Sequence, residues 1–133
     1  MTPVREGIEA NEAAPQSRFR GVLERLRQNV AGARAIVVAA SDGMVLDQVS
    51  LDPAADVDLL AAEFAMLLRI AGRTSEDTGS GGLVEHILVS EKAITIARHI
   101  SPEQFLILVF DIQDQIGRAR YEMKQAAWEL GLK

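Results

Sequence analysis

The sequence predicts one α/β domain of the α+β kind, in which a five-stranded antiparallel sheet carries two helices on one face and one helix on the other. Three observations predict it. The chain has 133 residues, of which 48% are hydrophobic, and this length and composition fit one domain. Apolar patterns follow the order helix, two strands, helix, three strands, helix (αββαβββα). Short turns join the strands within each group, which favours antiparallel neighbours.

The N-terminal part of the chain divides into a tail and a helix. Residues 1–16 lack apolar periodicity and contain two prolines, so we expect a flexible tail followed by one domain over residues 17–133. Ser17 is placed to cap a helix over residues 17–31, and Gly32 is placed to end it. The apolar stripe of this helix consists of Phe19, Val22, Leu23, Leu26 and Val30.

Two short apolar runs predict the first pair of strands, residues 35–40 and 45–49. The intervening Ser41-Asp42-Gly43 predicts a hairpin turn, because glycine accepts a positive φ and aspartate tolerates it.

A long helical pattern opens at Asp56, after Pro53, and continues to about Arg73. One face of it is apolar and suits packing on the sheet: Val57, Leu60, Ala61, Phe64, Leu67, Leu68 and Ala71. A second stripe on the far side consists of Leu59, Ala62, Met66 and Ile70, with Asp58, Glu63, Arg69 and Arg73 along its borders. We expect this second stripe to face another chain. The alternative is a helix buried on all sides within the monomer.

The C-terminal half predicts a loop, three strands and a helix. Residues 74–82 are polar and glycine-rich, but no lysine follows the glycines, so we expect a plain connection and no phosphate-binding loop. Strands are predicted over residues 83–90, 93–100 and 104–112, with the last one central because it is apolar on both faces. The first two of these strands contain charged residues and histidines, which places them nearer an edge.

The last helix is predicted over residues 114–130, with Gly131 ending it. Its core stripe consists of Ile116, Ala119, Met123, Ala126, Ala127 and Leu130. Tyr121 and Trp128 are seven residues apart and share another side. We expect this pair to pack against the first helix.

Charge is distributed unevenly along the chain. Residues 17–41 contain five arginines and one glutamate, a balance of +4. Residues 42–68 contain no base and six acids, a balance of −6: Asp42, Asp47, Asp52, Asp56, Asp58 and Glu63. The simple interpretation of this charge distribution is that the charged residues lie on faces exposed to water. The alternative interpretation is that the acidic segment forms a docking edge for a basic partner.

Several classes of function are disfavoured by composition. The net charge of −5 argues against nucleic-acid binding. The sequence has neither a signal-peptide pattern nor an apolar run long enough to span a membrane, so we expect a cytoplasmic protein with no membrane insertion. The absence of cysteine excludes thiol chemistry and fits a reducing compartment.

Catalytic and metal-binding patterns are also lacking. His86 and His99 are the only histidines, each within a predicted strand, and a half-buried structural role suits them better than metal ligation. The serines have no glycine-flanked elbow, and the carboxylates have no ligand spacing. We therefore expect no catalytic residue, cofactor or metal, and do not expect an enzyme.

Four strings resemble the roadblock (dynein light chain) family, and within it the bacterial MglB-like branch: FRGVLERL, GARAIVVAASDGMVL, DLLAAEFAMLLRIAGRTSE and IGRARYEMKQAAWEL. The resemblance extends over residues 17–131. It implies a profilin-like roadblock fold with strand order 2-1-5-4-3. It also implies a homodimer joined through the third strand and the middle helix.

The resemblance further implies a function. MglB-like dimers bind a Ras-like small GTPase of the MglA type and accelerate GTP hydrolysis without an arginine finger. The implied dimer and GTPase face of the middle helix consists of Leu59, Ala62, Glu63, Met66, Arg69, Ile70 and Arg73. A family adaptor with no effect on GTP hydrolysis is the main alternative. A sensor module that binds a small ligand on the sheet is a weaker one.

Overall fold

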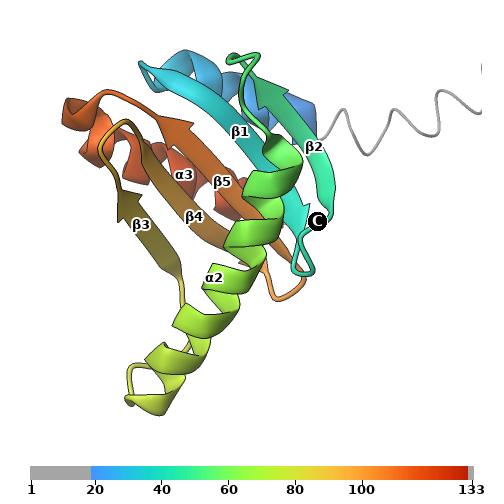
Figure 1. The fold of residues 1–133 in the computed structure, drawn as a ribbon, viewed down its shortest axis with the longest axis vertical. Helices are drawn as coiled ribbons and strands as arrows, with labels where there is room; N and C mark the ends of the chain where they lie inside the picture. The colour runs from blue at the N-terminus through green and yellow to red at the C-terminus, as the bar shows by residue number, and fades with distance from the viewer. Residues whose placement is uncertain (1–18, 132–133) are drawn as a thin grey trace, which may run out of the picture.

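The structure, a computed structural model, describes residues 19–131 (Figure 1). The expected tail over residues 1–16 and the expected cap at Ser17 lie outside the described residues.

The described chain forms the predicted elements in the predicted order. A first helix is described over residues 19–29. The elements that follow are β1 (Ala33–Ala40), β2 (Val45–Ser50), α2 (Val57–Asp77), β3 (Glu85–Val89), β4 (Ile94–Ser101), β5 (Gln104–Phe110), a short 3-10 turn (Gln113–Gln115) and α3 (Ile116–Gly131). All strand pairs are antiparallel, in the order β2-β1-β5-β4-β3. The fold class and strand order expected from the sequence are confirmed, with β5 central.

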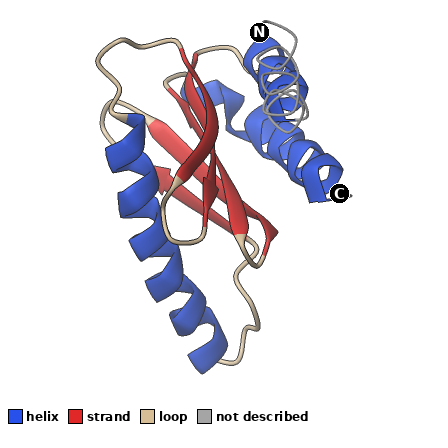
Figure 2. Ribbon diagram, turned by 90° about the vertical axis from the view of Figure 1, so that its right-hand side faces the viewer, coloured by secondary structure: helices blue, strands red, loops and turns tan. Residues whose placement is uncertain are grey.

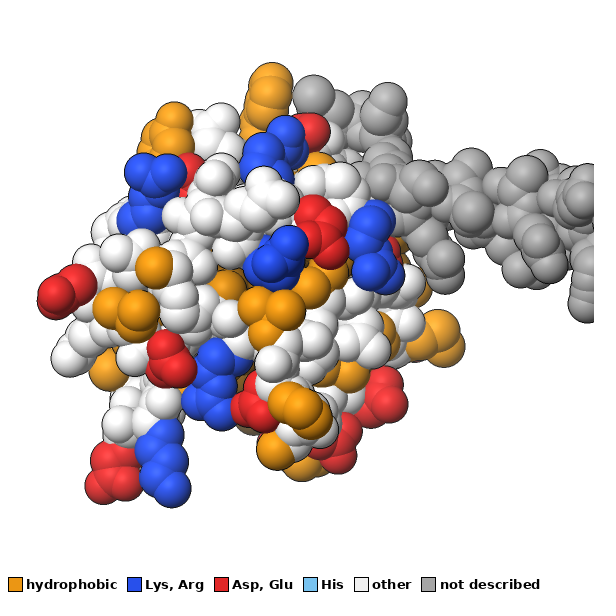
Figure 3. All heavy atoms as spheres, turned by 90° about the horizontal axis from the view of Figure 1, so that it is seen from above, with side chains coloured by type: hydrophobic (Ala, Val, Ile, Leu, Met, Phe, Trp, Pro, Cys, Tyr) orange, Lys and Arg blue, Asp and Glu red, His pale blue; other side chains and the backbone are white. Residues whose placement is uncertain are grey.

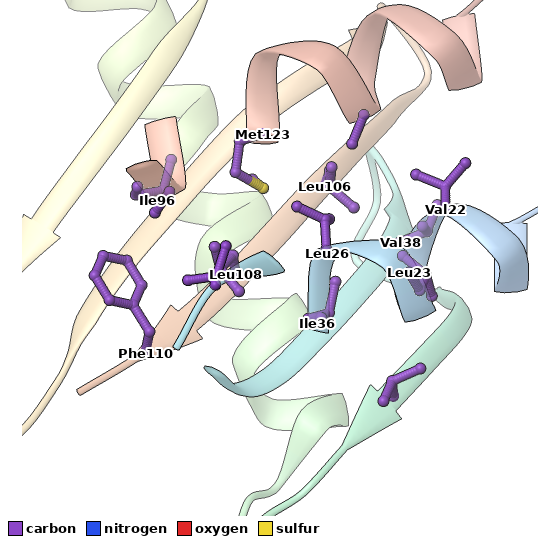
Figure 4. Packing of buried hydrophobic residues seen from close by; sticks show 14 of the residues in the cluster. Val22, Leu23, Leu26, Ile36, Val38, Ile96, Leu106, Leu108, Phe110 and Met123 are labelled. Atoms are coloured by element: carbon purple, nitrogen blue, oxygen red, sulfur yellow. The ribbon is translucent and has the colours of Figure 1, made fainter. Parts of the chain in front are cut away.

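Three layers are visible in Figure 2: α2 covers one face of the sheet, and the first helix and α3 cover the other. The larger core lies between the sheet and this helix pair (Figure 4). Its members include Val22, Leu23, Leu26, Ile36, Val38, Ile96, Leu106, Leu108, Phe110 and Met123. A smaller core beneath α2 is formed around Phe64, Phe105 and Ile107.

Helix α2 is longer than predicted. It continues to Asp77 and so includes the first residues of the segment that was expected to be a loop. The hydroxyl of Thr74 donates to the Ile70 carbonyl at 3.0 Å, and the hydroxyl of Thr78 donates to the Thr74 carbonyl at 2.8 Å. These local bonds let polar residues continue the helix. Gly79, with φ of +80°, follows the helix end. Helix α3 likewise includes Gly131, which was expected to end it.

The expectation that Tyr121 and Trp128 pack against the first helix is wrong for Trp128, which lies beside β4, whereas Tyr121 borders an open groove next to the first helix without being buried by it. The side chains of Tyr121 and Trp128 are 59% and 66% exposed. The first helix instead meets α3 through smaller and charged groups, including an ion pair between Arg25 and Glu129. Helical spacing places the two aromatic residues on one side of α3, and that side faces away from the core.

Candidate functional site

Helix α2 is held in place at its N-terminal end by side-chain hydrogen bonds. The Asp56 carboxylate accepts the Leu59 backbone N–H at 3.0 Å and caps the helix. Just before the helix, Arg34 of β1 donates to Asp52 at 2.6 Å, and Asp52 also accepts the Ala54 N–H at 3.0 Å. The bond from Arg34 and then the bond from Ala54 hold the pKa of Asp52 below its ordinary value of 3.8. These contacts tie the start of α2 to the sheet.

The β1–β2 turn supports the middle of α2. Gly43 has φ of +97°, and the Asp42 carboxylate accepts the Met44 N–H at 3.1 Å, so the predicted Asp-Gly turn is present. A Cβ at Gly43 would lie 3.1 Å from the Ala62 Cα, which is closer than most real contacts. Glycine at this position therefore serves the turn and also lets α2 approach it.

The two stripes of α2 separate as the sequence predicts. Ala61, Phe64, Ala65 and Leu68 are buried against the sheet. The residues expected to form the partner face are all exposed along the outer side of α2: Leu59, Ala62, Glu63, Met66, Arg69, Ile70 and Arg73. Three large apolar members, Leu59, Met66 and Ile70, are 56%, 48% and 52% exposed. The alternative of a helix buried on all sides within the monomer is wrong. We call these seven residues the outer α2 stripe.

The two edges of the sheet differ. Edge strand β2 contains the buried Asp47, paired with Arg20 at 2.7 Å, and its pairing with β1 is irregular. Inward-pointing charges and bulges discourage an edge from pairing with another chain. Edge strand β3 pairs in regular register with β4 and exposes Leu88 and Val89. Within the described chain, β3 is therefore the edge better suited to receive a second strand.

The apolar residues of this edge were not identified from the sequence as site residues. Besides Leu88 and Val89, Val84 is exposed just before β3. The family resemblance had implied the strand order that leaves β3 at an edge, and the run LVEHILVS contains the exposed residues, but the individual residues were not named as a site.

An open groove of about 520 Å³ lies between the second half of α2 and the β1–β2 turn. Arg69, Arg73 and Glu76 line it from α2, and Asp42 lines it from the turn. Neither arginine makes an ion pair with a described residue. Both guanidinium groups are thus available to an outside carboxylate or other acceptor.

At the end of the molecule shown in Figure 3, acidic, basic and apolar side chains are interspersed.

The two histidines have packing roles, as expected. His86 meets Phe64 edge-on, with ring centroids 6.3 Å apart, and His99 meets Phe105 in the same way at 6.4 Å. Both are half-buried. Among the described residues, no cluster of histidine and carboxylate side chains could hold a metal ion.

The acidic segment is mostly used within the domain. Besides the buried Asp47, the carboxylates of Asp42, Asp52 and Asp56 each accept a hydrogen bond from a nearby backbone N–H. Residues 42–68 as a whole therefore do not form an acidic docking edge.

The comparisons with known proteins identify the family. A Roadblock/LC7 domain profile matches residues 21–110. The chain belongs to the Roadblock/LC7 family. No curated protein sequence matches it. No helix among the described residues has the length and apolar character that a membrane crossing needs.

Solved structures similar to this Roadblock/LC7 chain include MglB proteins and an MglC protein. Thermus thermophilus MglB, a gliding protein, is 24% identical, with 90% of each chain covered and a TM-score of 0.80. Myxococcus xanthus MglB is 19% identical, with 87% of this chain and 86% of that chain covered and a TM-score of 0.80. Myxococcus xanthus MglC is 29% identical, with 86% and 98% covered and a TM-score of 0.62. The likeness to the MglB structures establishes the MglB-like form of the fold.

Proposed function

We propose that this protein is a cytoplasmic homodimer that binds a Ras-like small GTPase of the MglA type and accelerates its GTP hydrolysis. It supplies no catalytic residue of its own. Two observations carry the proposal: the outer α2 stripe is exposed, and β3 is an unpaired edge strand. The similarity to MglB supports the choice of partner.

The apolar residues of the outer α2 stripe favour dimerisation. Burying the exposed area of Leu59, Met66 and Ile70 contributes several kcal/mol at about 25 cal/mol per Å². A β3 strand from a second copy would also pair the free backbone groups of the β3 edge.

The charges on the outer α2 stripe and at its border favour an antiparallel arrangement of two α2 helices. Asp58 and Glu63 lie toward the N-terminal end, and Arg69 and Arg73 lie toward the C-terminal end. Antiparallel packing centred on Met66 brings Glu63 of one copy opposite Arg69 of the other. Parallel packing would bring like charges together, which is unfavourable.

Light scattering on four variants tests the dimer. Met66→Arg should give a monomer, because it buries an unpaired charge at the centre of the interface. Leu51→Arg is the matched control: Leu51 is 51% exposed, follows β2 and lies beside the first-helix layer, so this variant should stay dimeric. Glu63→Arg should weaken the dimer, and adding Arg69→Glu should restore it. A monomeric wild type at tens of micromolar would contradict the proposal.

A hydrolysis assay tests the effect on the GTPase. The immobilised dimer is used to recover an MglA-type GTPase from a lysate of its own cells, and GTP turnover is then measured with and without the dimer. Acceleration that is lost with Met66→Arg supports the proposal. Binding without acceleration would assign the protein to the adaptor class.

A further inference from the structure

The outer side of α3 carries an aromatic surface that the proposed function does not use. Tyr121 and Trp128 are both exposed there, on the opposite side of the sheet from α2. Exposed tyrosine and tryptophan side chains are enriched at binding surfaces, where they offer large contact area at little entropic cost. Trp128 is also the only tryptophan of the chain.

A groove of about 450 Å³ lies beside Trp128, between α3 and the end of β4. Lys124 and Gln125 line it from α3, and Arg98 and Ile100 line it from β4. The end of α3 approaches β4 closely, since a Cβ at Gly131 would lie 3.1 Å from the Ile100 carbonyl oxygen. The groove is therefore bounded by two packed elements.

The charge around this groove is positive. Arg98 and Arg120 both contact Glu85, at 3.3 and 2.8 Å, so two guanidinium groups share one carboxylate. Lys124 adds a third cation and makes no ion pair with a described residue. None of the described residues that line the groove is acidic.

The carboxylates of α3 do not offset this charge. Glu122 pairs with Arg118, and Glu129 pairs with Arg25 of the first helix. Each acid of α3 is already matched by its own arginine. An acidic ligand would therefore meet an unbalanced positive charge beside an exposed indole ring.

We propose that the Trp128 groove is a second docking site, which takes an acidic peptide segment of another protein. One large apolar side chain of the segment packs on Trp128, and its carboxylates lie near Lys124 and Arg98. Helices α3 and α2 cover opposite faces of the sheet, and none of the seven residues of the outer α2 stripe lines this groove. The protein would thus join two different partners.

Titration with short synthetic peptides tests this proposal on the full chain. One peptide has a central leucine among aspartates and glutamates, a second replaces the acids with lysines, and a third replaces the leucine with glycine. Trp128 emission should shift to shorter wavelength as the first peptide saturates the site, and the lysine peptide should cause no shift. The glycine peptide should bind about tenfold more weakly, because it lacks the anchor.

Two charge-reversal variants locate the site. Lys124→Glu should weaken the acidic peptide about tenfold or more. Lys92→Glu is the control, because Lys92 is an exposed lysine on the β3–β4 turn, away from the groove; it should leave the affinity unchanged.

Three results would overturn the proposal. Equal binding of the acidic and basic peptides would show that charge does not select the occupant. No emission change up to about 1 mM peptide would show that the groove binds no such segment at useful affinity. The third result concerns a variant that lacks residues 1–16. If its Trp128 emission differs from that of the full chain, and if only this variant binds the acidic peptide, then the chain's own acidic N-terminal segment occupies the groove.

Discussion

Replacing Gly43 with alanine places a methyl group between the β1–β2 turn and α2. The new Cβ would lie 3.1 Å from the Ala62 Cα and 3.4 Å from the Ala65 Cβ, at a backbone φ of +97°. Neither neighbour is the flexible end of a long side chain. Alanine must therefore strain the turn, or α2 must shift away from the sheet.

The expected loss has two parts. A non-glycine residue in left-handed backbone costs about 1–2 kcal/mol, and overpacking a close contact costs about 1–3 kcal/mol more. Gly79→Ala is the matched control, because Gly79 has φ of +80° and a methyl group added there would meet nothing within 4 Å. Gly43→Ala should therefore lower the free energy of unfolding by about 2–5 kcal/mol, and Gly79→Ala by about 1–2 kcal/mol.

Thermal unfolding followed by circular dichroism, at one protein concentration, measures both variants. At roughly 4 °C per kcal/mol for a domain of this size, the two melting temperatures should differ by several degrees. The concentration is fixed because a dimer's stability depends on it. Equal losses for Gly43→Ala and Gly79→Ala would refute the claim that the turn supports α2.

Three further outcomes are expected. Arg73→Ala should weaken GTPase acceleration about tenfold at most in single-turnover assays, as for one partly exposed contact; a thousandfold loss with binding intact would make Arg73 an inserted finger. Removing residues 1–16 should leave the melting temperature within a few degrees in a calorimetric scan. Arg34→Ala should raise the pKa of Asp52 toward 3.8 in a carbon-13 NMR titration. The stabilisation from this pair is present above that value and is lost as the pH falls through the lowered pKa.

Local patterns predicted most of the fold. The apolar periodicity placed both inner and outer faces of α2, and the Ser41-Asp42-Gly43 turn placed the first hairpin. The end of α2 was missed because Thr74 and Ser75 resemble loop residues in sequence. In the structure their hydroxyls are used locally, the Thr74 hydroxyl bonding the Ile70 carbonyl and the Ser75 hydroxyl bonding the Gly81 carbonyl.

Long-range packing explains what the sequence did not predict. A helical wheel shows that Tyr121 and Trp128 share a side, but it does not say which element that side meets. The answer depends on how α3 crosses β4, where Gly131 permits a close approach to Ile100. The apolar edge at Leu88 depends on the strand order, which the family resemblance implied but which local residue patterns do not give.

The acidic segment shows why charge along a sequence is a poor guide to charge on a surface. Four of its carboxylates accept backbone N–H groups at the turn, on β2 and at the start of α2, so they act within the domain. Asp58 and Glu63 remain, and both lie on α2 beside its exposed apolar residues. With Arg69 and Arg73 at the other end, Glu63 on the outer α2 stripe and Asp58 at its border give this side of α2 opposite charges at its two ends. Such a stripe is complementary to a reversed copy of itself, and this favours a closed two-fold dimer over an open chain of molecules.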